Sequence, residues 1–126
     1  MEKSFAVSDS SARYLYAVTN TDLLEIDPYS GGIVSRIRDV PRRFLNGAGL
    51  LNHVVATPTG SLKVITETLL IGEYDMKGRK WAANTVQIDQ TYSSAAGFVY
   101  LPSGELVAAL ETATGEAHLA VVDPSN

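Results

Sequence analysis

Short apolar runs alternate with clusters of turn-forming residues along almost the whole chain. The runs are rich in Val, Ile, Leu, Thr and Tyr and partly alternate between apolar and polar positions, which is typical of β-strands. No stretch carries a convincing helical stripe, because the nearest candidate, 41–52, contains two glycines. The pattern predicts strands at 4–9, 13–20, 22–27, 32–38, 52–57, 61–67, 69–75, 79–87, 96–101, 105–111 and 117–123.

The apolar runs recur with a fixed period. Asp27, Asp75 and Asp123 each end such a run and stand 48 residues apart in both steps, and 14–27 aligns with 62–75 without a gap. The turn sequences "ATPTGSL" and "YLPSGEL" recur with a spacing of 44. A fixed period of roughly 20–50 residues indicates a repeat architecture. We therefore expect a single segment, 1–126, with units at 1–43, 44–92 and 93–126, the last without its outer strand.

Antiparallel four-stranded units that repeat in this way are typical of the blades of a β-propeller. The predicted fold class is thus all-β, with propeller-like antiparallel blades and about 2.75 four-stranded units. A β-sandwich is the alternative, because short strands with frequent turns suit it as well. Sandwiches do not generally repeat their turn chemistry, so the recurring landmarks favour the propeller.

The first unit resembles a known propeller repeat. "YLYAVTN" followed by "LLEIDPYSGGIVSRI" is similar to the YVTN-type repeat, with a Tyr-Val-Thr-Asn strand and an Ile-Asp-Pro-x-[Thr/Ser]-Gly turn. The second unit keeps the Asp and a Gly, and the third keeps "VVDPS". The resemblance implies the lactonase/quinoprotein-like propeller superfamily, as an incomplete member. In lactonase-like propellers, axial side chains hold a divalent cation, and Asn52 and His53 are the matching residue types here.

The recurring aspartates have a structural explanation. Asp accepts backbone N–H bonds in a turn, Pro presets the following φ, and Gly supplies conformations that other residues avoid. We assign structural turn roles to Asp27, Gly31, Asp75, Gly78 and Asp123.

Composition narrows the range of functions. The chain has 126 residues and a net charge of −4, so it lacks the clustered basic excess that nucleic acid requires. It has no cysteine, which excludes disulfides, thiolate metal sites and cysteine nucleophiles. No apolar run has the length of a membrane span or a signal peptide. We expect a soluble protein without nucleic-acid or membrane partners, in a compartment that the sequence does not indicate.

No catalytic or metal-binding motif is present. Gly-x-Ser-x-Gly, glycine-rich phosphate loops and His-x-x-x-His are all absent, and neither a catalytic residue nor a metal or other cofactor is predicted. The acidic residues mostly alternate with apolar ones or lie in turns, so we interpret them as a solvated strand face. They are Asp22, Glu25, Glu67, Glu73, Glu105, Glu111 and Glu116.

The long connections at 38–52 and 88–97 are the candidates for a ligand or partner surface. Propellers commonly bind through loops that gather on one face of the ring. Arg and Tyr are also favoured interface anchors. The predicted binding residues are Arg42, Arg43, Asn46, His53, Gln90 and Tyr92.

A ring of blades is not closed by three units, because closed rings use about four to eight. We expect completion by self-association, by the remaining blades of a larger propeller, or by a clasp in which "SFAVSD" pairs as the outer strand of the third unit. The predicted function is a non-enzymatic binding or structural scaffold. The alternative is part of a lactonase-like or quinoprotein-like enzyme with an axial site.

Overall fold

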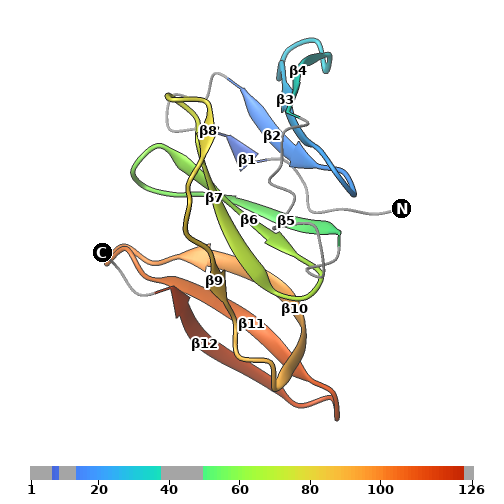
Figure 1. The fold of residues 1–126 in the computed structure, drawn as a ribbon, viewed down its shortest axis with the longest axis vertical. Coiled ribbons are helices and arrows are strands. Elements are labelled where there is room, and N and C mark those ends of the chain that lie inside the picture. Colours follow the sequence, from blue (N-terminus) through green and yellow to red (C-terminus); the bar gives the residue numbers. More distant parts are fainter. Residues whose placement is uncertain (1–6, 9–13, 38–49, 124–126) are drawn as a thin grey trace.

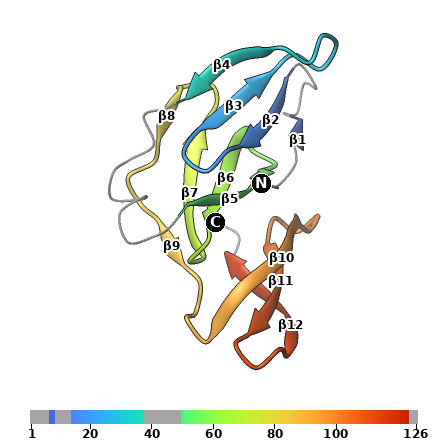
Figure 2. The ribbon, with the colours of Figure 1, turned by 90° about the vertical axis from the view of Figure 1, so that its right-hand side faces the viewer.

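The computed structural model describes residues 7–8, 14–37 and 50–123 (Figure 1). Within these residues every regular element is a β-strand, and the strands form three antiparallel sheets. The sheets follow one another in chain order in both views (Figures 1 and 2). The predicted all-β class of antiparallel blades is therefore confirmed. No described helix is long and apolar enough to cross a membrane.

The first sheet has the order β1-β2-β3-β4. β1 (Val7–Ser8) pairs with β2 (Leu15–Val18), which pairs with β3 (Leu23–Ile26), which pairs with β4 (Ile33–Ile37). Because β1 pairs with its own neighbour β2, the described part of the N-terminal segment belongs to the first sheet. The expected clasp on the third sheet is wrong for these residues.

The second sheet contains β5 (Leu51–Ala56), β6 (Ser61–Thr66) and β7 (Leu70–Asp75). Its outer strand is divided into β8 (Lys80–Trp81) and β9 (Val86–Gln87), which pair with opposite ends of β7. The prediction of one continuous strand over 79–87 is wrong, because this stretch is too long to follow β7 residue by residue and leaves the ladder between its two short strands.

The third sheet has the order β10-β11-β12, with β10 (Tyr92–Tyr100), β11 (Leu106–Thr112) and β12 (Ala117–Asp123). β10 begins earlier than predicted, so most of the expected connection 88–97 is strand. Its Ser-Ser-Ala-Ala-Gly sequence has weak strand propensity, and its pairing with β11 includes two register shifts.

Two separate apolar cores join the sheets. The first lies between the first and second sheets and includes Leu23, Leu62 and Val64; the second lies between the second and third sheets and includes Ile71 and Leu106. β5 also contacts both β1 and β10, so the first strands of the three sheets lie next to one another. The second sheet is thus buried on both faces, which a sandwich of two sheets does not require. The sandwich alternative is therefore wrong.

Candidate functional site

The two cores give each sheet a defined orientation. In β6, Leu62 and Val64 belong to the first core, whereas Ile65 belongs to the second. We call the face that packs on the preceding sheet the trailing face, and the opposite face the leading face. In the third sheet, Leu106 and Ala108 lie on the trailing face, since they pack in the second core. Its leading face is therefore the opposite side of the sheet.

The registers identify equivalent positions on the three leading faces. Val18 pairs with Leu23 in the first sheet, Ile65 with Ile71 in the second, and Ala109 with Leu119 in the third. Their burial differs sharply: Leu23 is 0% exposed and Ile71 is 1% exposed, but Leu119 is 78% exposed. The same position is thus core in two sheets and solvent-exposed in the third.

Leu119 belongs to a larger apolar surface. Val99 pairs with Val107, which in turn pairs with Val121, and this row lies two positions along the strands from Ala109 and Leu119. Val99 is 56% exposed and Val121 is 50% exposed. We call these five residues the open apolar face. Monomeric proteins rarely leave contiguous apolar patches of this kind uncovered.

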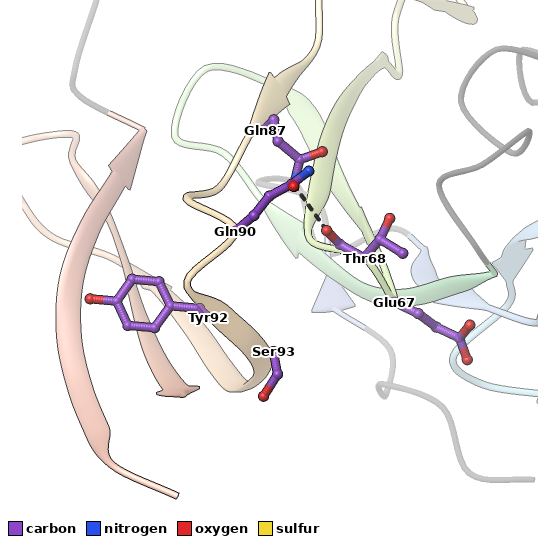
Figure 3. Close-up of a pocket in the computed structure, with 6 residues that line it drawn as sticks. All are labelled: Glu67, Thr68, Gln87, Gln90, Tyr92 and Ser93. Carbon is purple, nitrogen blue, oxygen red and sulfur yellow. Dashed lines mark hydrogen bonds between the residues drawn. The ribbon is translucent and has the colours of Figure 1, made fainter. Parts of the chain in front are cut away.

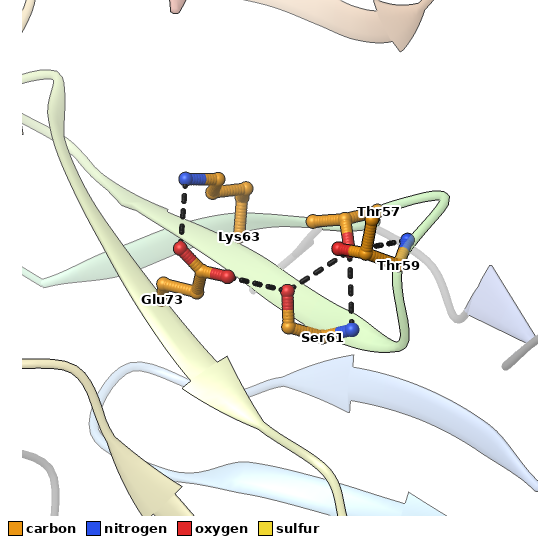
Figure 4. Close-up of polar contacts among 5 residues, drawn as sticks. All are labelled: Thr57, Thr59, Ser61, Lys63 and Glu73. Carbon is orange, nitrogen blue, oxygen red and sulfur yellow. Dashed lines mark hydrogen bonds and ion pairs between the residues drawn. The ribbon is translucent and has the colours of Figure 1, made fainter. Parts of the chain in front are cut away.

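The row of the second sheet that corresponds to Val107 and Val121 is polar. There Lys63 pairs with Glu73, and the Lys63 Nζ lies 3.0 Å from the Glu73 Oε1. The Ser61 hydroxyl donates to the Glu73 Oε2 at 2.6 Å and lies 2.9 Å from the Thr57 hydroxyl (Figure 4). Partial burial raises the pKa of Glu73, but hydrogen bonds from Ser61 and Lys63 and the Lys63 charge outweigh it. The pKa therefore lies below its ordinary value of 4.5.

The first sheet carries a buried polar pair in the same row. The Tyr16 hydroxyl donates to the Glu25 Oε2 at 2.8 Å, and Arg79 from the turn after β7 lies 3.9 Å from the same oxygen. Glu25 is only 6% exposed, so the expectation that it belongs to a solvated face is wrong. Its charge is accommodated between two partners from different sheets.

A polar pocket of about 370 Å³ lies where the β6–β7 turn approaches the start of β10 (Figure 3). Gln87 closes one side, because its Nε2 donates to the Thr68 carbonyl at 2.9 Å and to the Leu69 carbonyl at 3.2 Å. The lining residues are Glu67, Thr68, Gln87, Gln90, Tyr92 and Ser93. The structure thus brings two residues of the predicted binding surface, Gln90 and Tyr92, into one pocket with the β6–β7 turn.

Of the other predicted binding residues, only His53 is described, and it does not line this pocket. Arg42, Arg43 and Asn46 lie outside the described residues. His53 lies in β5, where its ring packs edge-on against Phe98 of the third sheet with centroids 5.2 Å apart. His53 therefore contributes to packing between the second and third sheets.

The carboxylates are distributed among separate contacts. Asp22 pairs with Arg36 at 3.0 Å, and the Glu105 and Glu111 carboxylates accept hydrogen bonds from Ser103 and Ser94. Among residues 7–8, 14–37 and 50–123, no group of three or more His, Asp or Glu side chains could hold a metal ion.

In the hairpin turns at Asp27 and Asp75, the aspartate side chain accepts a hydrogen bond from the backbone two residues further on. The Asp27 Oδ1 accepts from the Tyr29 N–H at 2.9 Å, and the Asp75 Oδ1 accepts from the Lys77 N–H at 3.1 Å. Gly31 takes the positive φ of the first turn at 75°, whereas Arg79 takes it in the second at 55°. Gly78 instead allows a close approach, because a Cβ there would lie 2.7 Å from the Asp75 Oδ2. Asp123 ends β12, opposite Leu106.

Similar solved structures are β-propellers. The WD40 β-propeller domain of Doa1 matches with a TM-score of 0.58 and 11% identity, over 89% of this chain and 38% of that one. A Bacteroides uniformis protein described as a 6-phosphogluconolactonase matches with a TM-score of 0.64 and 15% identity, over 96% of this chain and 37% of that one. The chain has the fold of a β-propeller segment, built of propeller-like antiparallel blades.

These likenesses concern the fold, since both identities are low. The chain spans a little over a third of the length of the structures that it matches. No family model and no curated protein match the chain. The propeller-type part of the sequence resemblance is therefore supported, and membership of the YVTN-type repeat family stays a prediction.

Proposed function

We propose that this β-propeller segment is a non-enzymatic binding scaffold, and that it binds another β-sheet through its open apolar face. The observation that carries this proposal is the exposure of Leu119, whose equivalents Leu23 and Ile71 are both buried by a neighbouring sheet. Full burial of one such aliphatic side chain contributes about 1.5–3 kcal/mol, so an uncovered face of this kind has a strong tendency to associate.

The composition of the face supports the same function. In the first and second sheets the corresponding row contains Glu25 and Glu73, each with its own polar partner. In the third sheet that row is Val107 and Val121. In this row the exposed leading face is therefore more apolar than the two faces that are buried within the chain. An apolar surface without unpaired charges can be covered without the desolvation cost that buried ions impose.

If this face of the third sheet remained exposed to solvent, charged residues would be favoured over apolar ones. Natural sheets usually protect exposed surfaces and edges with charged residues or proline, which limit unwanted association. Val99, Leu119 and Val121 provide no such protection. The fold by itself serves both enzymes and scaffolds, so the proposal depends on this surface and not on the likeness to either propeller.

Thiol accessibility tests the proposal, because the chain has no cysteine of its own. Leu119→Cys places a probe on the open apolar face, and Tyr29→Cys places a control probe in a turn where the native side chain is 94% exposed. Both variants are labelled with a membrane-permeant maleimide in the cells that produce the protein naturally. We expect labelling at position 119 to be at least tenfold slower than at position 29. Equal rates in two folded variants would overturn the proposal.

A further inference from the structure

We infer that the partner of the open apolar face is the trailing face of the first sheet in a second copy of this chain. This inference rests on the proposed function and names the occupant of the same surface. Within one chain, a leading face packs on a trailing face twice, once in each core. The described chain has one leading face without a following sheet and one trailing face without a preceding sheet, in the third and first sheets respectively.

The trailing face of the first sheet, which no described sheet covers and on which Leu24 is 9% exposed, repeats the chemistry of the two occupied trailing faces. Leu15, Leu62 and Leu106 hold equivalent positions in β2, β6 and β11, and Leu62 and Leu106 are fully buried in the two cores. Leu15 pairs with Ile26, as Leu62 pairs with Tyr74. The first sheet therefore offers the same leucine that a leading face covers elsewhere in the molecule.

The next row on the trailing face of the first sheet also matches the corresponding rows of the second and third sheets. Ala17 is equivalent to Val64 and Ala108, which pack in the first and second cores. In the second core, Ile65 of the leading face packs in one cluster with Ala108 of the trailing face. The corresponding contact between copies joins Ala109 of one copy to Ala17 of the other. Both are only partly covered in the single chain.

The number of sheets in each chain also indicates how many copies would associate. Two copies related by a twofold axis would use both free faces of each chain, so neither copy retains an uncovered leading or trailing face. The product is a closed ring of six sheets, which is within the range of about four to eight that propellers use. A single copy cannot reach closure in this way, and a chain of copies that does not close would grow into a fibre.

The purified 126-residue chain tests this inference directly. Analytical ultracentrifugation should give a species with twice the mass of the 13.5 kDa chain. Leu119→Asp should raise the dissociation constant about a hundredfold or more, because each dimer loses two buried leucines. Tyr29→Asp, in an exposed turn, should leave it unchanged. Circular dichroism should show that both variants keep the wild-type strand signal.

Crosslinking between two singly substituted variants locates the contact. A mixture of Ala109→Cys and Ala17→Cys, treated with a short thiol crosslinker, should give a covalent dimer. Ala109→Cys mixed with Tyr29→Cys should not. A monomer at all accessible concentrations would overturn the inference, and so would a dimer that crosslinks Ala109→Cys to itself. Protection of Leu119→Cys in cells together with a monomeric purified chain would leave the proposed function in place and assign the face to another chain or to further blades.

Discussion

The second and third sheets share one strand plan but differ in what covers them. Ile71 and Leu119 occupy equivalent positions on their leading faces, yet Ile71 is a core residue and Leu119 faces solvent. One row further on, the second sheet has the Lys63–Glu73 ion pair where the third has Val107 and Val121. The covered sheet therefore includes a polar row at its interface, whereas the uncovered sheet is apolar throughout the corresponding rows. The comparison shows that burial in a repeat protein depends on a sheet's neighbour as much as on its own residues.

Shortening the equivalent residues Ile71 and Leu119 to alanine should give the largest difference in the free energy of unfolding. Ile71→Ala is expected to lower the free energy of unfolding by about 2–5 kcal/mol, because it leaves a cavity in the second core. Leu119→Ala, measured at a concentration where the chain is monomeric, should change it by less than about 0.5 kcal/mol. Urea denaturation monitored by Trp81 fluorescence measures both. Equal costs would mean that the third sheet's leading face is covered within a single chain.

The buried polar pair of the first sheet should have the next largest effect. Tyr16→Phe removes the hydroxyl that donates to Glu25 and leaves a buried carboxylate with Arg79 as its one charged neighbour among the described residues. We expect a loss of about 1–3 kcal/mol in the free energy of unfolding. Ser103→Ala, which removes a similar hydrogen bond to Glu105 on the surface, is the matched control and should cost less than about 0.5 kcal/mol. Similar losses for both variants would show that Glu25 is solvated.

The polar row of the second sheet should contribute a small stabilisation that depends on pH. The pKa of Glu73 is lower in the folded chain than its ordinary value of 4.5, so its contribution is present above that value. It is lost as the pH falls from 4.5 through the folded pKa. Since the Glu73 side chain is 36% exposed, we expect no more than about 0.5 kcal/mol. Wild type and Glu73→Gln should therefore converge in stability below this range, and parallel pH profiles would contradict the assignment.

Transferring the polar row to the third sheet should affect stability least and association most. Val107→Lys combined with Val121→Glu reproduces the Lys63–Glu73 arrangement in its equivalent register. Because both positions border solvent, the free energy of unfolding of the monomer should change by less than about 0.5 kcal/mol. Sedimentation should show that the double variant associates more weakly than the wild type, because the added charges must be desolvated at the interface. Association equal to that of the wild type would exclude this row from the interface.

Much of the strand plan followed from turn chemistry in the sequence. The Asp-Pro turn after β3 and the Pro-Thr-Gly and Pro-Ser-Gly turns fix the ends of strands locally, so their neighbours could be placed from spacing alone. The divided outer strand could not be placed, because the interruption between β8 and β9 depends on how many residues follow β7. The early start of β10 could not be placed from the sequence either, because pairing with β11 overrides the weak strand propensity of its serines and alanines.

The alignment of the first two units was accurate at one end only. Aligned without a gap, Tyr16 lies over Val64, but the registers place Tyr16 opposite Glu25 in the way that Lys63 lies opposite Glu73. Between the equivalent pairs, Ile71 follows Ile65 by one residue more than Leu23 follows Val18, which moves β6 by one position. A shift of one residue exchanges the two faces of a strand, so the sequence alone assigned Tyr16 to the wrong equivalent.

The candidate site could be predicted from the sequence only in part. Gln90 and Tyr92 stood out as polar and aromatic residues in a connection, but their pocket partners Glu67 and Thr68 come from a turn more than twenty residues earlier. Only the packing of the third sheet on the second brings them together. The open apolar face gave no separate signal, because Val107, Leu119 and Val121 look like ordinary core residues of strands.

The sequence by itself determined that the chain forms repeated antiparallel strands, because alternation and turn residues act locally. It also determined that each strand has an apolar side. Which side faces a neighbour, and whether that neighbour exists, was decided only by the tertiary structure. Ile71 and Leu119 are both aliphatic residues at the same place in a repeat, and nothing within either strand separates them. The difference arises because the hydrophobic effect responds to the area that a neighbouring sheet removes from water, and within residues 7–8, 14–37 and 50–123 only one of the two sheets has that neighbour.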